Sequence, residues 1–244
     1  MNTSHNKILA IIPAYNEAES LSRLIPQIRF AAPDWDIVVV DDGSHDDTAS
    51  VAWGLGATLL QLPFNLGIGG AVQAGLIYAC RHNYDICLQI DGDGQHDPAE
   101  SVRLVQALLV TGADAVNGSR FMRQEGFQST FSRRLGIRIL RIAIRLLTGE
   151  VISDPTSGQR AFGRRAISLL ARSYPQEYPE PEVICTLRRN GLHLVELPVK
   201  MYARPAGQSS IRRFHSVLYM CKVLISICIT PSRRRLPSRN PTHD

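Results

Sequence analysis

The chain is poor in cysteine and has no long uninterrupted apolar run. The five cysteines are widely spaced: Cys80, Cys87, Cys185, Cys221 and Cys228. None of them form a CxxC pair, which argues against a zinc site or a disulfide framework and favours a reducing cytoplasm. The N-terminal MNTSHNK lacks the apolar region of a signal peptide, so we expect none.

Acidic residues are missing from two arginine-rich stretches. Residues 133–145 contain five arginines, residues 233–239 contain four, and neither stretch has Asp or Glu. The net charge of +5 is therefore unevenly spread, which favours nucleic acid, anionic lipid or a phosphorylated substrate as partner. Because no aromatic residues alternate with the arginines of the first stretch, we do not expect nucleic-acid binding.

The first arginine-rich stretch predicts a basic amphipathic helix. Its arginines recur on one helix face at Arg134, Arg138, Arg141 and Arg145. An apolar face beside them consists of Ile137, Leu140, Ile144 and Leu147. Such a helix is typical of a membrane surface.

A second apolar helix is predicted near the C-terminus, over Ser216–Thr230. A spanning helix needs about 20 apolar residues, so this shorter segment is interpreted as an interfacial or partner-binding helix. The alternative for both helices is packing on the core. We expect residues 1–212 to form one catalytic domain, 213–231 to form this apolar helix, and 232–244 to be a basic disordered tail.

Apolar segments alternate with helical segments in the first half of the chain. Strands are predicted over residues 7–12, 36–40, 57–62, 84–90 and 114–119. Helices are predicted over 17–32, 46–55, 70–82 and 98–111, and the second half adds helices over 132–147 and 181–190 and a strand over 193–201. Near-continuous apolar strands separated by helices predict an α/β fold with a mostly parallel sheet and helices on both faces.

Polar clusters follow four of the predicted strands. They are PAYNE (13–17), DDGSHDDT (41–48), NLGIGGAVQAG (65–75) and DGDGQHD (91–97). The carboxyl ends of parallel strands share one edge of the sheet, where ligands bind, so the four clusters predict one site. Asp91 and Asp93 supply hard oxygen donors suited to Mg²⁺ or Mn²⁺ held against a diphosphate. The glycines Gly67, Gly69 and Gly70 would let a helix N-terminus approach a phosphate.

These motifs, with NGSRF (117–121) and SDPTSGQRAF (153–162), resemble in order and spacing those of the family 2 glycosyltransferases. The chain looks most like their polyprenyl-phosphate sugar synthases, the dolichyl-phosphate mannose synthase group, over roughly residues 7–215. The resemblance implies a GT-A fold, a nucleotide-sugar donor, a divalent metal and inversion at the anomeric carbon. The synthases carry lysine after the serine that matches Ser209, where this chain has Ser210.

The resemblance also implies roles for particular residues. It assigns the donor nucleotide to Pro13, Tyr15, Glu17, Asp42 and Asp91. It assigns the metal, Mg²⁺ or Mn²⁺, to Asp91, Asp93 and Gln95.

The chemistry of a lipid-phosphate acceptor favours arginine. A phosphomonoester, with a second pKa of about 6, is already an anionic nucleophile and needs no general base. It needs cations that hold it in line with the anomeric carbon, and guanidinium forks suit that role. The candidates are Arg120, Arg133, Arg160 and Arg204. Glu180 or Glu182, with Glu182 preferred, would instead serve as a base toward a hydroxyl acceptor, unless these acids only stabilise a helix start.

The sequence thus predicts an inverting hexosyltransferase that moves sugar from a UDP- or GDP-sugar to polyprenyl (undecaprenyl) phosphate in cell-envelope polysaccharide assembly. It would work as a peripheral protein on the inner face of the cell membrane, with a small membrane protein as partner. Two alternatives stay open. One is transfer to a saccharide hydroxyl with Glu182 as base. The other is a non-catalytic, membrane-surface protein that binds nucleotide sugars.

Overall fold

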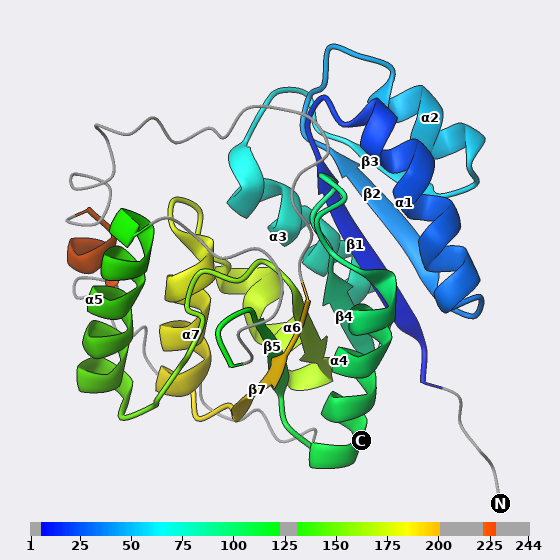
Figure 1. Cartoon of the computed structure of the whole chain (residues 1–244). Coiled ribbons are helices and arrows are strands. Elements are labelled where there is room, and N and C mark those ends of the chain that lie inside the picture. The colour runs from blue at the N-terminus through cyan, green and yellow to red at the C-terminus, as the bar shows by residue number, and fades with distance from the viewer. Residues whose placement is uncertain (1–5, 123–130, 201–221, 228–244) are drawn as a thin grey trace, which may run out of the picture.

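A computed structural model of the chain describes residues 6–122, 131–200 and 222–227, the side chains of 131–135 excepted. Its centre is one seven-stranded sheet (Figure 1). The strands are β1 Ile8–Ala14, β2 Asp36–Asp41, β3 Thr58–Gln61, β4 Ile86–Gln89, β5 Ala115–Ser119, β6 Arg160–Gly163 and β7 Leu194–Pro198. They lie in the order β3-β2-β1-β4-β6-β5-β7, and all the pairings are parallel except those of β6. The mostly parallel α/β sheet predicted from the sequence is confirmed.

Helices cover both faces of the sheet (Figure 1). They are α1 Ala18–Ala31, α2 Thr48–Gly54, α3 Gly67–Arg81, α4 Pro98–Thr111, α5 Phe131–Thr148, α6 Arg164–Ser173 and α7 Pro179–Arg189. One apolar core joins α3, α5, α6 and α7 to one face, and a second joins α1, α2 and α4 to the other. Strands β1, β2, β4 and β5 are therefore buried on both sides, which explains their near-continuous apolar sequences.

Helix α4 has the bounds that its end signals predict. Asp97 caps its start, with the side chain accepting a hydrogen bond from Ala99 N at 2.8 Å, and Pro98 occupies the first turn. Gly112 ends it at φ 63°, a left-handed conformation that favours glycine. This helix follows directly from the loop 91–97, so its cap fixes one end of that loop.

The sequence prediction missed strand β6 and helix α6, because it placed no strand or helix between residues 147 and 181. The strand has only four residues and begins with an arginine, so no apolar run marks it. It lies between β4 and β5 and runs antiparallel to both, with Arg160 opposite Gln89 and Asn117. The start of β6 is therefore at the edge where β4 and β5 end, and it brings residues 158–160 to the predicted site.

Helix α5 is amphipathic as predicted, but its predicted apolar face is largely buried. Leu140 and Ile144 are at most 1% exposed and belong to the core. Other apolar side chains lie outside, with Ile142 at 56% and Leu146 at 81% exposed. The alternative of core packing thus holds for the inner face, and the outer face combines apolar and basic residues.

The C-terminal helix is described only over residues 222–227. Val223 and Ile227 are buried in the core, and Arg189 Nη2 of α7 donates to the Ile227 carbonyl at 2.9 Å. This part of the predicted 213–231 helix packs on the domain. Within the described ranges, no helix is at once long and apolar enough to pass through a bilayer.

Candidate active site

The loops that follow β1 and β2 are tied together at the carboxyl edge of the sheet. Asn16 N donates to Ser44 Oγ at 2.9 Å, and His45 N donates to Asn16 Oδ1 at 2.8 Å. Asn16 has φ 55°, a left-handed conformation that asparagine tolerates well. The PAYNE and DDGSHDDT motifs therefore form one rigid side of the predicted site.

The predicted donor residues line this side. Pro13 is in the last part of β1, and Tyr15 is 42% exposed with its ring edge-on to His45. The backbone N–H of Glu17 donates to Thr48 Oγ1 at 2.9 Å, which joins the start of α1 to α2. Tyr15 is therefore the donor candidate on this side whose ring is open to a ligand.

Asp42, another predicted donor residue, holds the start of α3. Its carboxylate accepts hydrogen bonds from Leu66 N at 2.7 Å and Gly67 N at 2.9 Å. Burial raises the pKa of Asp42 although these two hydrogen bonds lower it. Of the three glycines that the sequence suggested for a phosphate, Gly67 thus already donates its N–H to Asp42.

The glycines of α3 serve packing. A Cβ atom on Gly69 would stand 2.5 Å from the Gln176 carbonyl oxygen, and one on Gly75 would stand 2.4 Å from Ile11 Cγ2. Glycine at these positions lets α3 approach the segment 174–178 and the sheet closely.

The predicted metal residues occupy the loop after β4. Asp93 is buried, and its Oδ1 accepts a hydrogen bond from Gln95 N at 3.0 Å, so the two residues form a tight turn. The Asp91 side chain is 32% exposed and open to the site. Two carboxylates and an amide oxygen within five residues are a donor set that fits Mg²⁺ or Mn²⁺. No three His, Cys, Asp or Glu side chains within the described ranges are grouped to hold a metal by themselves, so a bound diphosphate would have to complete the coordination.

Arg120 follows the end of β5 at this edge of the sheet, and a buried acid binds its guanidinium. Its Nε and Nη2 donate to the Asp154 carboxylate at 2.6 and 2.8 Å, and Nη2 also donates to Thr156 Oγ1 at 2.7 Å. Burial alone would lower the pKa of Arg120, yet the hydrogen bonds and charge of Asp154 raise it. Arg120 thereby keeps its charge, and the negative charge of Asp91 also favours it.

Arg160 lies beneath the site and has almost no exposed surface. Its Nε donates to Asn117 Oδ1 at 2.8 Å, and its Nη2 donates to the Glu180 carbonyl at 2.6 Å. Burial lowers the pKa of Arg160. In this arrangement Arg160 holds β5, β6 and α7 together and provides positive charge from below.

Hydrogen bonds that the sequence did not reveal hold the start of the loop before β6, at Ser153 and Asp154. Glu196 of β7 accepts hydrogen bonds from Ser153 N at 2.5 Å, Asp154 N at 3.1 Å and Asn117 Nδ2 at 3.0 Å. Asn117 Nδ2 also donates to the Asp154 carbonyl at 2.9 Å. Because these partners come from distant segments, only the β5–β7 pairing could have indicated them.

This geometry agrees with the result of a family comparison. Residues 9–170 match the model of glycosyl transferase family 2. The chain belongs to glycosyl transferase family 2. It is therefore a glycosyltransferase, and the GT-A fold expected from the resemblance is confirmed.

Curated relatives and solved structures extend this result. The family 2 chain is 33% identical to the undecaprenyl-phosphate mannosyltransferase of Micrococcus luteus, over 84% of the chain and 87% of the relative. It is 31% identical to the polyprenol monophosphomannose synthase of Mycolicibacterium smegmatis, over 84% and 81%. Glucosyl-3-phosphoglycerate synthase of Mycobacterium tuberculosis in complex with Mg²⁺ and UDP has TM-score 0.70 and 26% identity, covering 92% of this chain and 79% of that one. The same enzyme with Mn²⁺, UDP and glucosyl-3-phosphoglycerate has TM-score 0.72 and 24% identity.

The two acids at the start of α7 face different surroundings in this glycosyltransferase. Glu182, the preferred base candidate, accepts a hydrogen bond from Ser226 Oγ at 2.8 Å, on the side of the C-terminal helix. Burial raises the pKa of Glu180, and the charges of Arg160, Asp91 and Arg120 act on it, so Glu180 is within electrostatic reach of the site. Glu180 therefore stays a base candidate beside Glu182. Two further acceptor candidates remain: Arg204 lies outside the described residues, and so does the side chain of Arg133.

Proposed function

We propose that this glycosyltransferase moves a hexose from a UDP- or GDP-sugar to polyprenyl phosphate, with inversion and with Mg²⁺ or Mn²⁺ as cofactor. The names of the two curated relatives support a lipid-phosphate acceptor. The metal complexes of the M. tuberculosis enzyme support a divalent cofactor. The single observation that carries the proposal is the open carboxylate of Asp91 beside Asp93, at the sheet edge and within the electrostatic reach of Arg120.

The donor would bind across the carboxyl ends of β1, β2 and β4. Pro13, Tyr15, Glu17 and Asp42 would surround its nucleotide, and Tyr15 offers a ring face to the base. Asp91, Asp93 and Gln95 would hold the metal, which neutralises charge on the leaving diphosphate when bound. The hydrogen bond from Gln95 N to Asp93 Oδ1 holds the turn that carries these two residues.

The acceptor phosphate needs no base. One of its oxygens forms the new bond to the anomeric carbon while the bond from that carbon to the nucleoside diphosphate breaks, and in-line displacement inverts the configuration. Arg120 and Arg204 are proposed to hold this phosphate. Arg160, which is fully buried, would contribute charge without touching the acceptor. Ser210 replaces the lysine of the synthases, so arginines would carry more of the phosphate binding here.

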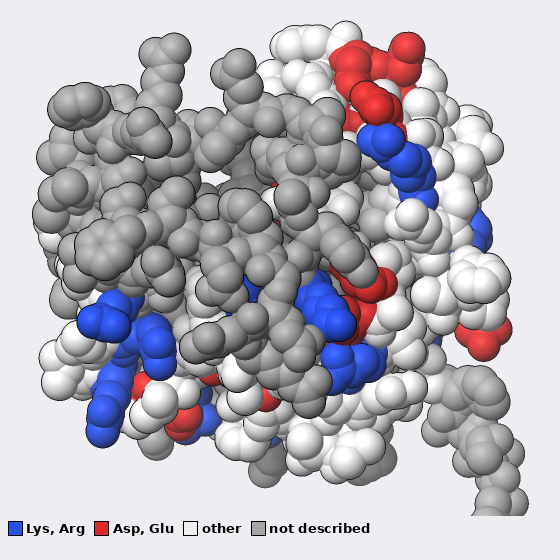
Figure 2. All heavy atoms as spheres, viewed as in Figure 1, with Lys and Arg blue, Asp and Glu red and all other residues white. Residues whose placement is uncertain are grey.

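The outer face of α5 is proposed to rest on the cytoplasmic leaflet of the membrane. Arg138 and Arg145 are exposed there, beside the exposed Ile142 and Leu146. Figure 2 shows Lys and Arg side chains gathered over the α5 region at the lower left. Basic residues attract anionic lipid, while the apolar ones enter the interface. A small membrane protein is proposed as a further partner near the C-terminal segment.

The test is transfer from radiolabelled sugar nucleotides. The purified protein is incubated with Mg²⁺, undecaprenyl phosphate and a panel of UDP- and GDP-sugars, and the lipids are then extracted. Label in the lipid phase from one donor, lost in EDTA and in Asp93→Ala, supports the proposal. Transfer that survives either change contradicts the metal assignment.

A second candidate is transfer to a hydroxyl group. Its support is Glu180, whose pKa is raised by burial and on which the charges of Arg160, Asp91 and Arg120 act, whereas Glu182 is hydrogen-bonded to Ser226. This candidate requires an acid that accepts a proton during the reaction, whereas the lipid-phosphate proposal does not. The two are separated by the Glu180 variant described below.

A further inference from the structure

A buried histidine beside the metal loop has two contacts with Asp91. The side chain of His96 has no exposed surface. Its Nδ1 accepts a hydrogen bond from Asp91 N at 3.2 Å. Its Nε2 lies 3.7 Å from Asp91 Oδ2, slightly beyond hydrogen-bonding distance. Both nitrogens of one ring thus lie against a single residue, Asp91.

The contact at Nδ1 determines which nitrogen of the ring carries the proton. An Nδ1 that accepts a backbone N–H carries no proton, so the neutral ring carries its proton on Nε2. This Nε2–H has no hydrogen-bond partner within the described residues, although it is buried. A buried donor without a partner costs free energy and calls for an explanation. The nearest acidic oxygen is the one that would satisfy it, Asp91 Oδ2.

The surroundings of Asp91 make this explanation specific. Gln89 Nε2 donates to Asp91 Oδ1 at 3.5 Å, and the backbone of Gly158 lies against Oδ2. A rotation of the Asp91 carboxylate that moves Oδ2 by a few tenths of an ångström would bring this oxygen within hydrogen-bonding distance of His96 Nε2. Binding of a divalent ion and diphosphate acts on this same carboxylate.

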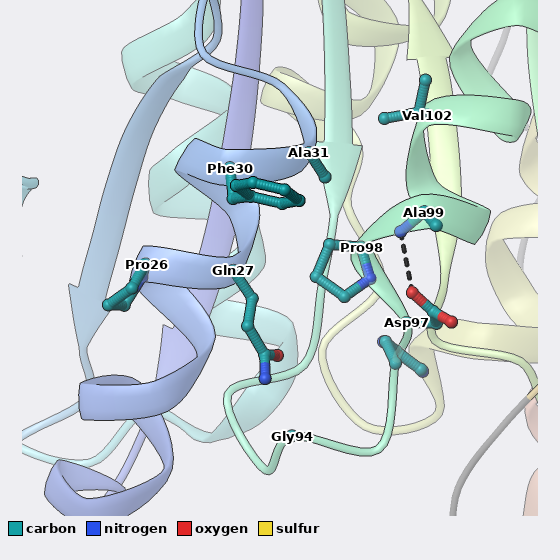
Figure 3. Close-up of a pocket in the computed structure, with 10 residues that line it drawn as sticks. Pro26, Gln27, Phe30, Ala31, Gly94, Asp97, Pro98, Ala99 and Val102 are labelled. Carbon is teal, nitrogen blue, oxygen red and sulfur yellow. Dashed lines mark hydrogen bonds between the residues drawn. The ribbon is translucent and has the colours of Figure 1, made fainter.

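His96 also borders a groove in the layer formed by α1 and α4. Figure 3 shows the groove between Pro26, Gln27 and Phe30 of α1 and the first turn of α4, with Gly94 of the metal loop beside it. His96 lines it too, whereas Asp91 and Asp93 do not. The groove and the metal loop thus share Gly94 and His96.

We propose that His96 is a positioning residue for Asp91. Its Nδ1 holds the Asp91 backbone, and its Nε2–H hydrogen-bonds Asp91 Oδ2 once donor and metal are bound, which orients the carboxylate toward the metal. This inference rests on the proposed metal-dependent function. It predicts that the two nitrogens have separable effects, one on the fold of the loop and one on metal binding.

Two variants of His96 separate these effects. Asparagine keeps an acceptor near Nδ1 and removes the donor, whereas glutamine places an amide N–H near Nε2 and removes the acceptor. We measure Mn²⁺ affinity by electron paramagnetic resonance with UDP or GDP present, beside thermal unfolding of the apo protein. His96→Asn should melt close to wild type yet bind Mn²⁺ about tenfold more weakly. His96→Gln should melt lower but keep Mn²⁺ affinity nearer to wild type. Gln27→Ala, in the groove wall, is the control and should change neither.

A nuclear magnetic resonance experiment on wild type gives an independent reading. In ¹⁵N-histidine-labelled protein, His96 should be the neutral ring with its proton on Nε2, and that proton should shift downfield when Mg²⁺ and the nucleoside diphosphate are added. A proton on Nδ1, or wild-type Mn²⁺ affinity in His96→Asn, overturns this inference but leaves the proposed function standing. If the wild-type protein fails to bind Mn²⁺ in the presence of UDP and also in the presence of GDP, the proposed metal dependence is overturned, and this inference with it.

Discussion

Gly158 lies directly against the carboxylate of Asp91, so that a Cβ atom on residue 158 would stand 2.5 Å from Asp91 Oδ2. The contact joins the loop before β6 to the loop after β4, far apart in sequence. It exists because β6 runs antiparallel between β4 and β5 and begins at the edge where they end. Any side chain at 158 must displace the carboxylate proposed to hold the metal.

Replacing Gly158 with alanine should therefore impair catalysis while leaving the fold intact. Displacing a catalytic group by about 1 Å can cost about 100-fold in rate, and we expect a loss of that size in sugar transfer. Gly163→Ala at the other end of β6 is the control, because a Cβ there meets no atom closer than 3.5 Å. Equal activity of the two variants would show that the Gly158 contact does not position Asp91.

Replacing Asp154 with asparagine should destabilise the protein strongly. Asp154 is fully buried, and its loss leaves Arg120 with an unpaired charge, which costs about 3–5 kcal/mol. The exposed pair of Asp85 and Arg164 is the control, since Asp85→Asn should cost less than about 1 kcal/mol. Urea unfolding at pH 7 compares the two variants, and similar losses would contradict the structural role of Asp154.

The pair of Asp154 and Arg120 makes the stability of the protein depend on pH. Although burial raises it, the hydrogen bonds and charge of Arg120 hold the pKa of Asp154 below its ordinary value. The folded state therefore binds fewer protons than the unfolded state, and the stability from Asp154 is present above the unfolded pKa and lost as pH falls through the lower folded pKa. The difference in unfolding free energy between wild type and Asp154→Asn should shrink in that acidic range and stay constant above it.

Variants of Glu180 and Glu182 at the start of α7 distinguish a hydroxyl acceptor from a lipid-phosphate acceptor. A general base contributes about 10²–10⁴-fold to a rate, so Glu180→Gln should lose that much only if the acceptor is a hydroxyl. With a lipid phosphate, Glu180→Gln should keep most of its kcat. Glu182→Gln is the matched control, because Glu182 contacts Ser226 and should affect stability more than transfer.

The outer face of α5 should bind anionic vesicles in a salt-dependent way. Each arginine near an anionic surface adds about 1 kcal/mol, so removing Arg138 and Arg145 together by substitution with glutamine should weaken binding about 30-fold. Arg23→Gln with Arg81→Gln removes the same charge from α1 and α3 and is the control. Flotation with phosphatidylglycerol vesicles measures the effect, and equal loss in both double variants would assign binding to net charge rather than to α5.

Much of the fold could be predicted because the relevant signals are local. The Pro98 start and Gly112 end of α4 are read from adjacent residues, and a parallel sheet necessarily brings the four polar clusters to one edge. The contact of Gly158 with Asp91 could not be predicted, because it depends on a four-residue strand without an apolar pattern. The surroundings of Glu180 and Glu182 depend on how α7 is rotated against its neighbours, which helical periodicity alone left open.

The central claim is that a lipid phosphate is the nucleophile, and one comparison tests it most directly. Wild-type protein with Mg²⁺ and its sugar nucleotide is offered undecaprenyl phosphate or undecaprenol, and the extracted product is analysed by mass spectrometry and anomeric nuclear magnetic resonance. We predict transfer to undecaprenyl phosphate only, with the anomeric configuration inverted relative to the donor. Transfer to the free alcohol at a comparable rate, or a retained configuration, would contradict this account.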